Sequence, residues 1–294
     1  MISLVTGGAG FIGSNLVDFL LEKGHEVVCI DNESANNDKF YWNNKAININ
    51  VDVCDYKVLK SCFSNVDYVF HLAAESRLQP AIENPIQAVY RNCVGTATVL
   101  QCAREVGVKR LVYSSTSSGY GNNSYPNVET QSDDCLNPYS ASKVAAEKFC
   151  KMYSDLYGLE TVVLRYFNVF GERSPERGQY APVIGIFQRQ KDSNEQLTIV
   201  GDGTQRRDFI HVKDVARANY LAATQSIDEF GEVFNVGSGK CYSVNSIADS
   251  ISSNQINIPP RSGEMDTTFA DIKKITETFG WKPEIDVIDW IKSQ

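Results

Sequence analysis

The sequence has little positive charge and few of the residues that usually bind metals. Its 294 residues contain 28 Lys and Arg against 36 Asp and Glu, which gives a formal net charge of −8. No basic run is present that could follow a nucleic-acid backbone. The three histidines and eight scattered cysteines include no CxxC pair. We therefore expect neither a nucleic-acid partner nor a bound metal.

Long hydrophobic runs are also missing. No apolar segment approaches the ~20 residues of a membrane-spanning helix, so we expect no membrane partner. The apolar stretch 2–6 follows Met1 directly and leaves no room for the regions of a signal peptide. The scattered cysteines fit free thiols in a reducing compartment. These features predict a cytoplasmic protein, and a hydrophobic content of 43% predicts a sizeable core.

Short apolar, partly β-branched segments alternate with helical patterns through the first 170 residues. Strands are expected at 2–6, 27–30, 47–51, 68–71, 109–114 and 161–165, and helices at 12–23, 85–106 and 138–157. This alternation predicts an α/β fold with a doubly wound parallel sheet. Beyond residue 165 the pattern loosens into a smaller α/β C-terminal lobe, and a cleft between the two lobes is the expected site.

A glycine-rich turn follows the first expected strand. Gly7, Gly10 and Gly13 have the spacing of a turn that admits a pyrophosphate next to a helix N-terminus. Asp31 ends the second expected strand, where a carboxylate can bind the adenine-ribose diol and repel a 2′-phosphate. Together they predict a Rossmann-type domain that binds NAD. For Asp52 and Val53, after the third expected strand, an adenine contact and a solvated turn stay open.

A tyrosine and a lysine lie one helical turn apart in the helix expected at 138–157. Tyr139 and Lys143 share a face, so an ammonium could favour the phenolate and make Tyr139 a base toward a sugar hydroxyl. A solvated Tyr/Lys pair is the alternative. The Ser and Thr residues of 114–118 follow the fifth strand, at the sheet edge where ligands of such folds bind, and this favours the catalytic interpretation.

These motifs together resemble one known family. TGGAGFIG (6–13), HLAA (71–74), RYFNVFG (165–171) and GDGTQRRDFIHVKDV (201–215), with Asp31 and the Tyr/Lys pair, are similar to the extended short-chain dehydrogenases/reductases, specifically the NAD-dependent nucleotide-sugar epimerases and dehydratases. The resemblance implies residues 1–166 and roughly 208–236 as the NAD-binding domain. It leaves roughly 167–207 and 237–294 for the nucleotide-sugar lobe.

The resemblance also implies roles for single residues. Thr116, Tyr139 and Lys143 match the catalytic positions, and Asn92 matches an asparagine that holds the active-site helix. Further cofactor contacts fall on Phe11, Ile12, Asn32, Leu72, Ala73, Ala74, Ser114 and Tyr166. Substrate contacts fall on Arg77, Thr116, Asn168, Val200, Arg207, Arg261 and Thr268. A core valine remains an equal alternative for Val200.

The branches of this family differ in the residues that follow the active-site Thr. Dehydratases place an Asp/Glu pair there, whereas this chain has Ser117 and Ser118. The resemblance therefore implies 4-epimerisation of a UDP-sugar through a transient 4-keto intermediate. Thr268 replaces a larger gatekeeper, which implies room for an N-acetyl group. A 4,6-dehydratase, a 4-keto-sugar reductase and a non-catalytic NAD-binding sensor remain alternatives.

Two expected helices carry more apolar residues than one sheet face requires. Ala88, Val89 and Val99 lie in 85–106, and Val144, Phe149 and Met152 lie in 138–157. Relatives in the resembled family dimerise through these two helices. The expectation is a homodimer built on a four-helix bundle.

Overall fold

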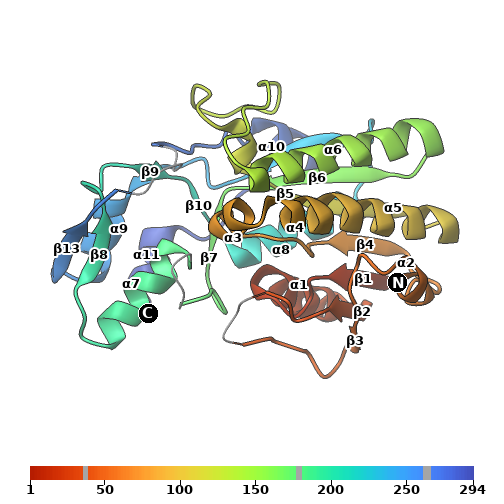
Figure 1. The fold of residues 1–294 in the computed structure, drawn as a ribbon, viewed down its shortest axis with the longest axis horizontal. Helices are drawn as coiled ribbons and strands as arrows, with labels where there is room; N and C mark the ends of the chain where they lie inside the picture. Colours follow the sequence, from red (N-terminus) through yellow and green to blue (C-terminus); the bar gives the residue numbers. More distant parts are fainter. Residues whose placement is uncertain (36–38, 177–180, 261–265) are drawn as a thin grey trace.

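Seven parallel strands form the central sheet of the protein. The computed structural model describes residues 1–35, 39–176, 181–260 and 266–294. The strand order in the sheet is β11-β6-β5-β4-β1-β2-β3 (Figure 1). From β1 the chain builds the sheet outward first on one side, through β2 and β3, and then on the other side from β4, as in a doubly wound fold. Its strands are β1 (Ile2–Thr6), β2 (Glu26–Asp31), β3 (Ile47–Asn50), β4 (Tyr68–His71), β5 (Arg110–Thr116), β6 (Thr161–Tyr166) and β11 (Glu232–Val236).

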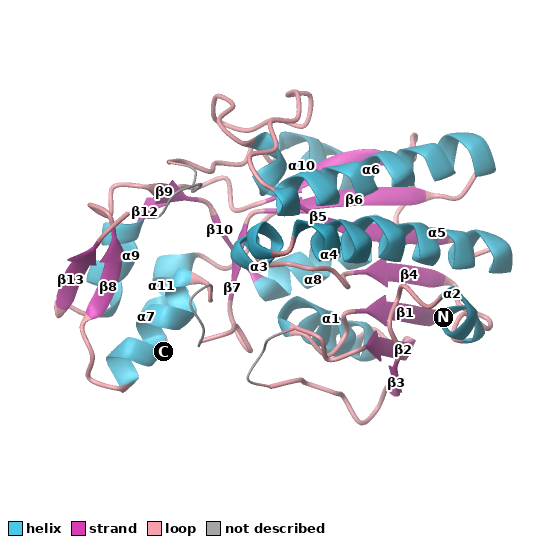
Figure 2. Ribbon diagram, viewed as in Figure 1, coloured by secondary structure: helices cyan, strands magenta, loops and turns pink. Residues whose placement is uncertain are grey.

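Helices cover both faces of this sheet, as Figure 2 shows. Alternate strand residues point to opposite faces, so Val5 packs with the helices of one face and Leu4 with those of the other. The first face carries α1 (Phe11–Glu22), α8 (Val212–Thr224) and α10 (Lys273–Phe279). The second face carries α2 (Tyr56–Ser61), α5 (Gly95–Val106) and α6 (Pro138–Tyr157). The expected α/β class is confirmed.

The helix α6 begins where the sequence predicts it. The Asn137 side chain accepts a hydrogen bond from the backbone N–H of Ser140 at 2.9 Å, and Pro138 occupies the first turn. Gly158 ends the helix in a left-handed conformation with a φ of +68°. These caps fix which residues of α6 face the end of β5.

The single helix expected at 85–106 is instead a composite. It consists of α4 (Pro85–Val89), a π-helical turn η1 (Tyr90–Val94) and α5. A short helix α3 (Leu78–Glu83) precedes it. A π-turn inserts one residue into the helical period, which the apolar pattern does not reveal, and such turns are frequent at functional sites.

A smaller lobe has its own core beside the sheet. It contains α7 (Val183–Asp192), β8 (Leu197–Val200), α9 (Val244–Ile251), β13 (Gln255–Ile258) and α11 (Val287–Lys292). β8 pairs with β13, and β9 (Arg206–Arg207) pairs with β12 (Tyr242–Ser243). β7 (Asn168–Phe170) and β10 (Phe209–His211) pair with each other where this lobe meets the central sheet. Within the described ranges, no helix combines the length and apolar character needed to cross a membrane.

Candidate active site

A tight glycine turn joins β1 to α1 at the carboxyl edge of the sheet. Gly7 has a φ of +68°, and a Cβ on it would lie 2.8 Å from the backbone nitrogen of Ala73. A Cβ on Gly13 would lie only 2.1 Å from the carbonyl oxygen of Gly7. The helix starts after Gly10 without a side-chain cap, so its first N–H groups remain available to an anion. The turn therefore fits the pyrophosphate of a dinucleotide.

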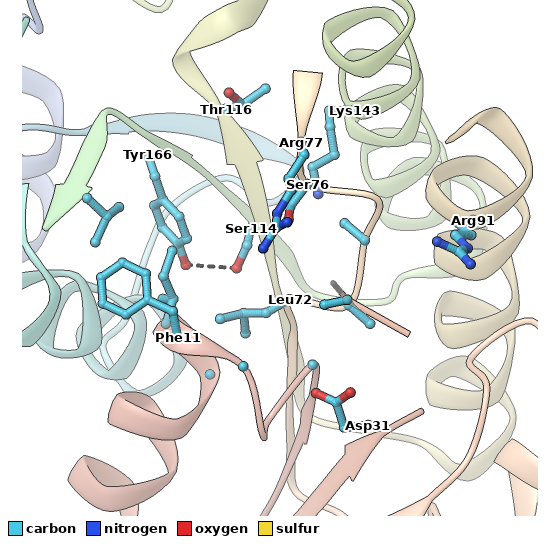
Figure 3. Close-up of a pocket in the computed structure, with 18 of the residues that line it drawn as sticks. Phe11, Asp31, Leu72, Ser76, Arg77, Arg91, Ser114, Thr116, Lys143 and Tyr166 are labelled. Carbon is cyan, nitrogen blue, oxygen red and sulfur yellow. Dashed lines mark hydrogen bonds between the residues drawn. The ribbon is translucent and has the colours of Figure 1, made fainter. Parts of the chain in front are cut away.

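Asp31 lies across from this turn, at the end of β2. Its Oδ2 accepts a hydrogen bond from the backbone N–H of Ala9 at 3.1 Å, and its Oδ1 accepts one from Glu33 at 2.8 Å. Burial raises the pKa of this carboxyl, while these backbone hydrogen bonds lower it. The hydrogen bonds aim the carboxylate into the cavity, where it can accept from a ribose diol (Figure 3).

One continuous cavity, here called the cofactor cavity, connects Asp31 to the active-site helix. It brings together most of the residues expected to bind NAD. Those that line it are Gly7, Gly10, Phe11, Ile12, Gly13, Asp31, Asn32, Val53, Leu72, Ala73, Ala74, Ser114, Tyr139, Lys143 and Tyr166. Asp52 does not line it, because its carboxylate accepts hydrogen bonds from Asn32 Nδ2 at 3.0 Å and from the backbone N–H of Cys54 at 2.8 Å. The lining is consistent with NAD, with Val53 rather than Asp52 at the adenine end.

Tyr139, Lys143 and Thr116 meet at the opposite end of the cofactor cavity. Thr116 ends β5 and lines the cavity together with Tyr139, and its Oγ1 accepts a hydrogen bond from the backbone N–H of Ser118 at 3.1 Å. The Lys143 ammonium lies 4.4 Å from the ring centroid of Tyr113. On the same strand, Ser114 shares a 2.8 Å hydrogen bond with the Tyr166 hydroxyl (Figure 3).

Burial governs the protonation of this pair. Burial raises the pKa of the Tyr139 phenol, and the hydrogen bond from Thr116 opposes this only in part. Burial also lowers the pKa of Lys143 to about 8. For the protein alone the direction of the phenol pKa is therefore upward, because desolvation is the largest influence on it; the expectation of a base at Tyr139 also counts on the positive charge of a bound nicotinamide. A further positive charge is needed in the cavity.

Asn92 does not line the cofactor cavity but lies behind it, buried in the π-helical turn. Its Oδ1 accepts from the backbone N–H of Glu75 at 2.7 Å. Its Nδ2 donates to the carbonyl of Glu75 at 3.1 Å and to Ser142 Oγ at 2.9 Å. Ser142 Oγ in turn donates to the carbonyl oxygen of Tyr139 at 2.9 Å. Asn92 thus connects η1 to the residues on either side of the Tyr/Lys pair.

A second cavity, the substrate cavity, adjoins the first between the sheet and the smaller lobe. Tyr139, Ser76, Val169 and Pro182 line both. Three of the expected substrate residues line the second cavity, namely Asn168, Val200 and Arg207, while Arg77 and Thr116 line the first. A sugar bound between the cavities would therefore contact Tyr139.

Thr268 lies behind the substrate cavity rather than in its wall. It is buried, and its Oγ1 accepts a hydrogen bond from Asn168 Nδ2 at 3.0 Å. The interpretation of Thr268 as a gatekeeper in contact with the sugar is therefore corrected: it orients Asn168 through this hydrogen bond. Arg261, also expected to bind the diphosphate, lies outside the described residues.

The structure adds residues that the sequence did not indicate. Arg91 lines the cofactor cavity and pairs with Glu75 at 2.8 Å, and no local motif distinguishes it from a surface arginine. Gln205 lines the substrate cavity and donates to the carbonyl of Val200 at 2.9 Å. It precedes Arg207 by two residues, and this spacing in an extended segment could have placed both on one face.

The protein is a doubly wound α/β protein with a dinucleotide-binding turn and a Tyr/Lys pair at the sheet edge. This combination of fold and site defines the class of the short-chain dehydrogenases/reductases. A model of the NAD-dependent epimerase/dehydratase family matches residues 3–237, so the chain belongs to this family. The resemblance expected from the motifs is confirmed. The expected cofactor, NAD, is confirmed with it.

Several relatives are similar over nearly the whole chain. A putative UDP-glucose 4-epimerase of Methanocaldococcus jannaschii is 39% identical over 306 residues, covering 99% of this chain and 98% of the relative. The crystal structure of a UDP-glucose 4-epimerase of Thermotoga maritima with UDP-glucose has a TM-score of 0.94 at 34% identity, covering 99% of this chain and 96% of that one. A UDP-N-acetylglucosamine 4-epimerase of Methanobrevibacter ruminantium M1, in complex with UDP-N-acetylmuramic acid, has a TM-score of 0.92 at 33% identity, covering 99% and 95%.

Proposed function

We propose that this protein is an NAD-dependent UDP-hexose 4-epimerase. The observation that carries the proposal is the wall of the cavities around Tyr139. Among the described residues that line the two cavities, Asp31 supplies the only carboxylate, and it lies at the glycine-turn end. Ser118 lines the substrate cavity at a position where a dehydratase needs an acid. Without an acid near the sugar, a 4-keto intermediate has no route to dehydration.

The chain's own residues then divide the work. NAD, when bound, supplies the acceptor for the C4 hydride and later its donor. Tyr139 takes the proton of the C4 hydroxyl and returns it in the second half of the cycle, with the Thr116 hydroxyl beside it in the cavity wall. Lys143 stabilises the phenolate electrostatically. Arg207 is the donor placed to bind the nucleotide diphosphate, while Asn168, whose Nδ2 donates to Asp208 and Thr268, lines the cavity beside it; the sugar stays free to turn over between the half-reactions.

The relatives support a UDP-sugar as the substrate. Those compared above are named as epimerases of UDP-glucose or of UDP-N-acetylglucosamine. Asp31 disfavours the 2′-phosphate of NADP, which speaks against a reductase that uses NADPH. The assembled Thr116, Tyr139 and Lys143 speak against a non-catalytic sensor.

The test is proton NMR of the purified protein in D₂O with UDP-glucose, UDP-N-acetylglucosamine and their C4 epimers, without added reductant. We expect interconversion with no deuterium at C4. A 4-keto-6-deoxy product carrying solvent deuterium would instead identify a dehydratase. Tyr139→Phe should abolish turnover, whereas Tyr125→Phe, at a side chain that is 62% exposed, should not. Full activity of Tyr139→Phe would exclude Tyr139 as the base.

The domain division and assembly belong to the same proposal. Residues 1–166 with roughly 208–236 form the proposed NAD-binding domain, and roughly 167–207 with 237–294 the proposed nucleotide-sugar lobe, except that α10 packs on the central sheet. The eight cysteines are free thiols, which supports a cytoplasmic location. Of the apolar residues expected at a dimer interface, Ala88, Val99 and Val144 are buried within the protomer instead. Val89 and Met152 are exposed, as are Ile86 at 83% and Leu156 at 67%, which supports a homodimer through a four-helix bundle of the helices over 85–106 and 138–157. Sedimentation should give a dimer that Leu156→Glu dissociates, and a monomeric wild type would refute the dimer.

A further inference from the structure

A buried carboxylate occupies the same face of α6 as the Tyr/Lys pair. Tyr139, Lys143 and Glu147 follow one another at intervals of four residues, so their side chains share one face of the helix. Glu147 is only 2% exposed and Lys143 only 4%. A carboxylate is this deeply buried only when it is paired and hydrogen bonded.

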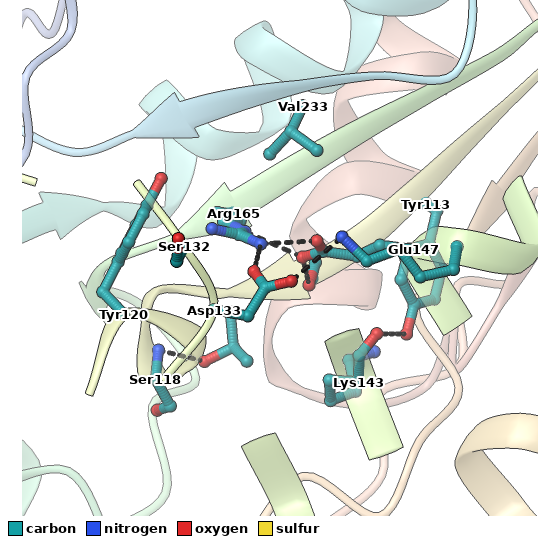
Figure 4. Close-up of polar contacts among 12 residues, drawn as sticks. Tyr113, Ser118, Tyr120, Ser132, Asp133, Lys143, Glu147, Arg165 and Val233 are labelled. Carbon is teal, nitrogen blue, oxygen red and sulfur yellow. Dashed lines mark hydrogen bonds and ion pairs between the residues drawn. The ribbon is translucent and has the colours of Figure 1, made fainter. Parts of the chain in front are cut away.

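Glu147 joins α6 to two strands of the sheet (Figure 4). Its Oε1 accepts hydrogen bonds from Ser115 Oγ on β5 and from Arg165 Nε on β6, the latter at 2.9 Å. Arg165 Nη2 lies 2.6 Å from Glu147 Oε2 and 2.7 Å from Asp133 Oδ1. Lys148 completes the chain with a 2.9 Å contact to Asp133.

The serine in this network stands within the catalytic strand. Ser115 lies between Ser114, which hydrogen bonds to Tyr166, and Thr116, which lines the cofactor cavity together with Tyr139. The hydrogen bond from Ser115 to Glu147 therefore fixes the hydroxyl end of β5 against α6. A shift of this strand end would move Thr116 relative to the Tyr139 phenol.

The charges around Lys143 make Glu147 unusual. Within the described part of the chain, Lys143 forms no ion pair. The titratable or charged groups that face Lys143 or its immediate neighbours are His71, Glu75, Cys93, Tyr113, Tyr139, Glu147, Cys150 and Arg165. Of these, Glu75 acts on Tyr139 and is paired with Arg91. Burial lowers the pKa of His71 to about 3 and raises the pKa of both thiols. Glu147 is the carboxylate of this set that shares the helix face of Lys143.

The partner of Glu147 does not cancel this charge. The Arg165 guanidinium is shared between two carboxylates, Glu147 and Asp133, so the three groups together carry one net negative charge. Lys148, which balances it, has a side chain that is 67% exposed and is screened by water. Burial lowers the pKa of Lys143, and Cys150, Glu147 and Cys93 oppose this effect; Glu147 is the carboxylate among the three.

We propose that Glu147 is a positioning residue for the active site: one turn beyond Lys143, it maintains the charge of that ammonium and holds the Ser115–Thr116 end of β5 opposite Tyr139. This role in catalysis rests on the proposed function. The arrangement of charges does not, so it is tested separately from activity.

The direct test is the titration of Lys143 by NMR in protein labelled at lysine Cε, with Lys143→Met to assign the resonance. In the wild type the pKa should be about 8. Glu147→Gln removes the carboxylate on the Lys143 face of α6 and leaves Arg165 paired with Asp133 alone, so it should lower the Lys143 pKa by about one pH unit. Glu147→Asp, which keeps the carboxylate, should leave the Lys143 pKa close to the wild-type value.

The matched control is Glu160→Gln. Glu160 pairs with Arg110 at 2.8 Å, at the opposite end of β5 from Thr116. This variant removes an arginine-bound carboxylate of the same sheet and should leave the Lys143 pKa unchanged. A Lys143 pKa that is equally unaffected by Glu147→Gln in a folded protein would overturn the proposal.

A second variant keeps the test decisive where Glu147→Gln does not fold. Asp133 is a more exposed partner of the same Arg165, and Asp133→Asn should lower the Lys143 pKa in the same direction, by about half a pH unit. No change in that variant would refute the charge network.

Activity then separates this inference from the proposed function. With a UDP-sugar that the wild type interconverts, the alkaline fall of kcat/KM should move to lower pH in Glu147→Gln by the same amount as the Lys143 pKa. A wild type that shows the NMR shift but interconverts no UDP-sugar would refute the proposed epimerase and leave the network in place. A shifted Lys143 pKa with an unshifted activity profile would refute the catalytic role.

Discussion

Asn92→Ala should destabilise the protein although the residue touches neither cavity. The side chain is 1% exposed and makes three hydrogen bonds, two to the backbone of Glu75 and one to Ser142 Oγ. A typical hydrogen bond contributes about 1 kcal/mol net, so the loss should be about 3 kcal/mol in the free energy of unfolding. For a chain of this size, that corresponds to a fall in Tm of about 6 to 12 °C.

The assay is urea unfolding followed by far-UV circular dichroism, together with turnover of a UDP-sugar. Turnover should fall at temperatures where the variant is still folded, because Ser142 loses the bond that helps fix Tyr139. The control is Asn48→Ala: Asn48 donates one exposed hydrogen bond to the carbonyl of Asn43 at 2.9 Å and should change stability by less than about 0.5 kcal/mol. A loss in Asn92→Ala no larger than in this control would refute the reasoning.

Two further predictions concern regions on either side of the site. Burial raises the pKa of Asp208 from 3.8 to about 6, so its stabilising contribution is full below pH 3.8 and is lost as the pH rises through 6. Between pH 4 and pH 7 the free energy of unfolding of the wild type should therefore fall by about 3 kcal/mol relative to that of Asp208→Asn. Urea titrations that show no such fall would exclude the raised pKa of Asp208. Arg173 pairs with Asp18 of α1 and lies over the ring of Tyr41, so Arg173→Ala should release bound NAD about two- to fivefold faster after gel filtration. The control is Arg189→Ala, which removes an exposed ion pair with Glu195. Equal rates of NAD release from Arg173→Ala and Arg189→Ala would contradict this prediction.

The elements that the sequence predicted best are those with a local cause. The caps Asn137 and Pro138 define the start of α6, and the buried runs of the parallel strands read directly from apolar composition. The π-helical turn at Tyr90–Val94 was not predictable, because one inserted residue leaves the apolar pattern of the helix nearly unchanged. That turn is nevertheless what places Asn92 behind the catalytic helix.

Among the site residues, too, those with a local cause were predictable and those that depend on distant contacts were not. The glycines and Asp31 were predictable because a turn and a strand end impose their identity. Thr268 was misplaced because its contact with Asn168 spans 100 residues of chain, and no sequence period connects them. The burial of Tyr139, which raises its pKa, depends on packing between α6 and β5 and is likewise invisible in the sequence.

The electrostatics of Tyr139 indicate why the two cavities meet at this residue. A phenol whose pKa is raised by burial is a weak base unless cations are held close to it. Lys143 supplies one such cation, yet with a pKa of about 8 it is itself close to losing its proton in the physiological range. Burial thus acts against both members of the pair. A base in this position works only if the nearby ammonium keeps its proton, and in α6 the carboxylate placed to favour that is Glu147, one turn further along the helix.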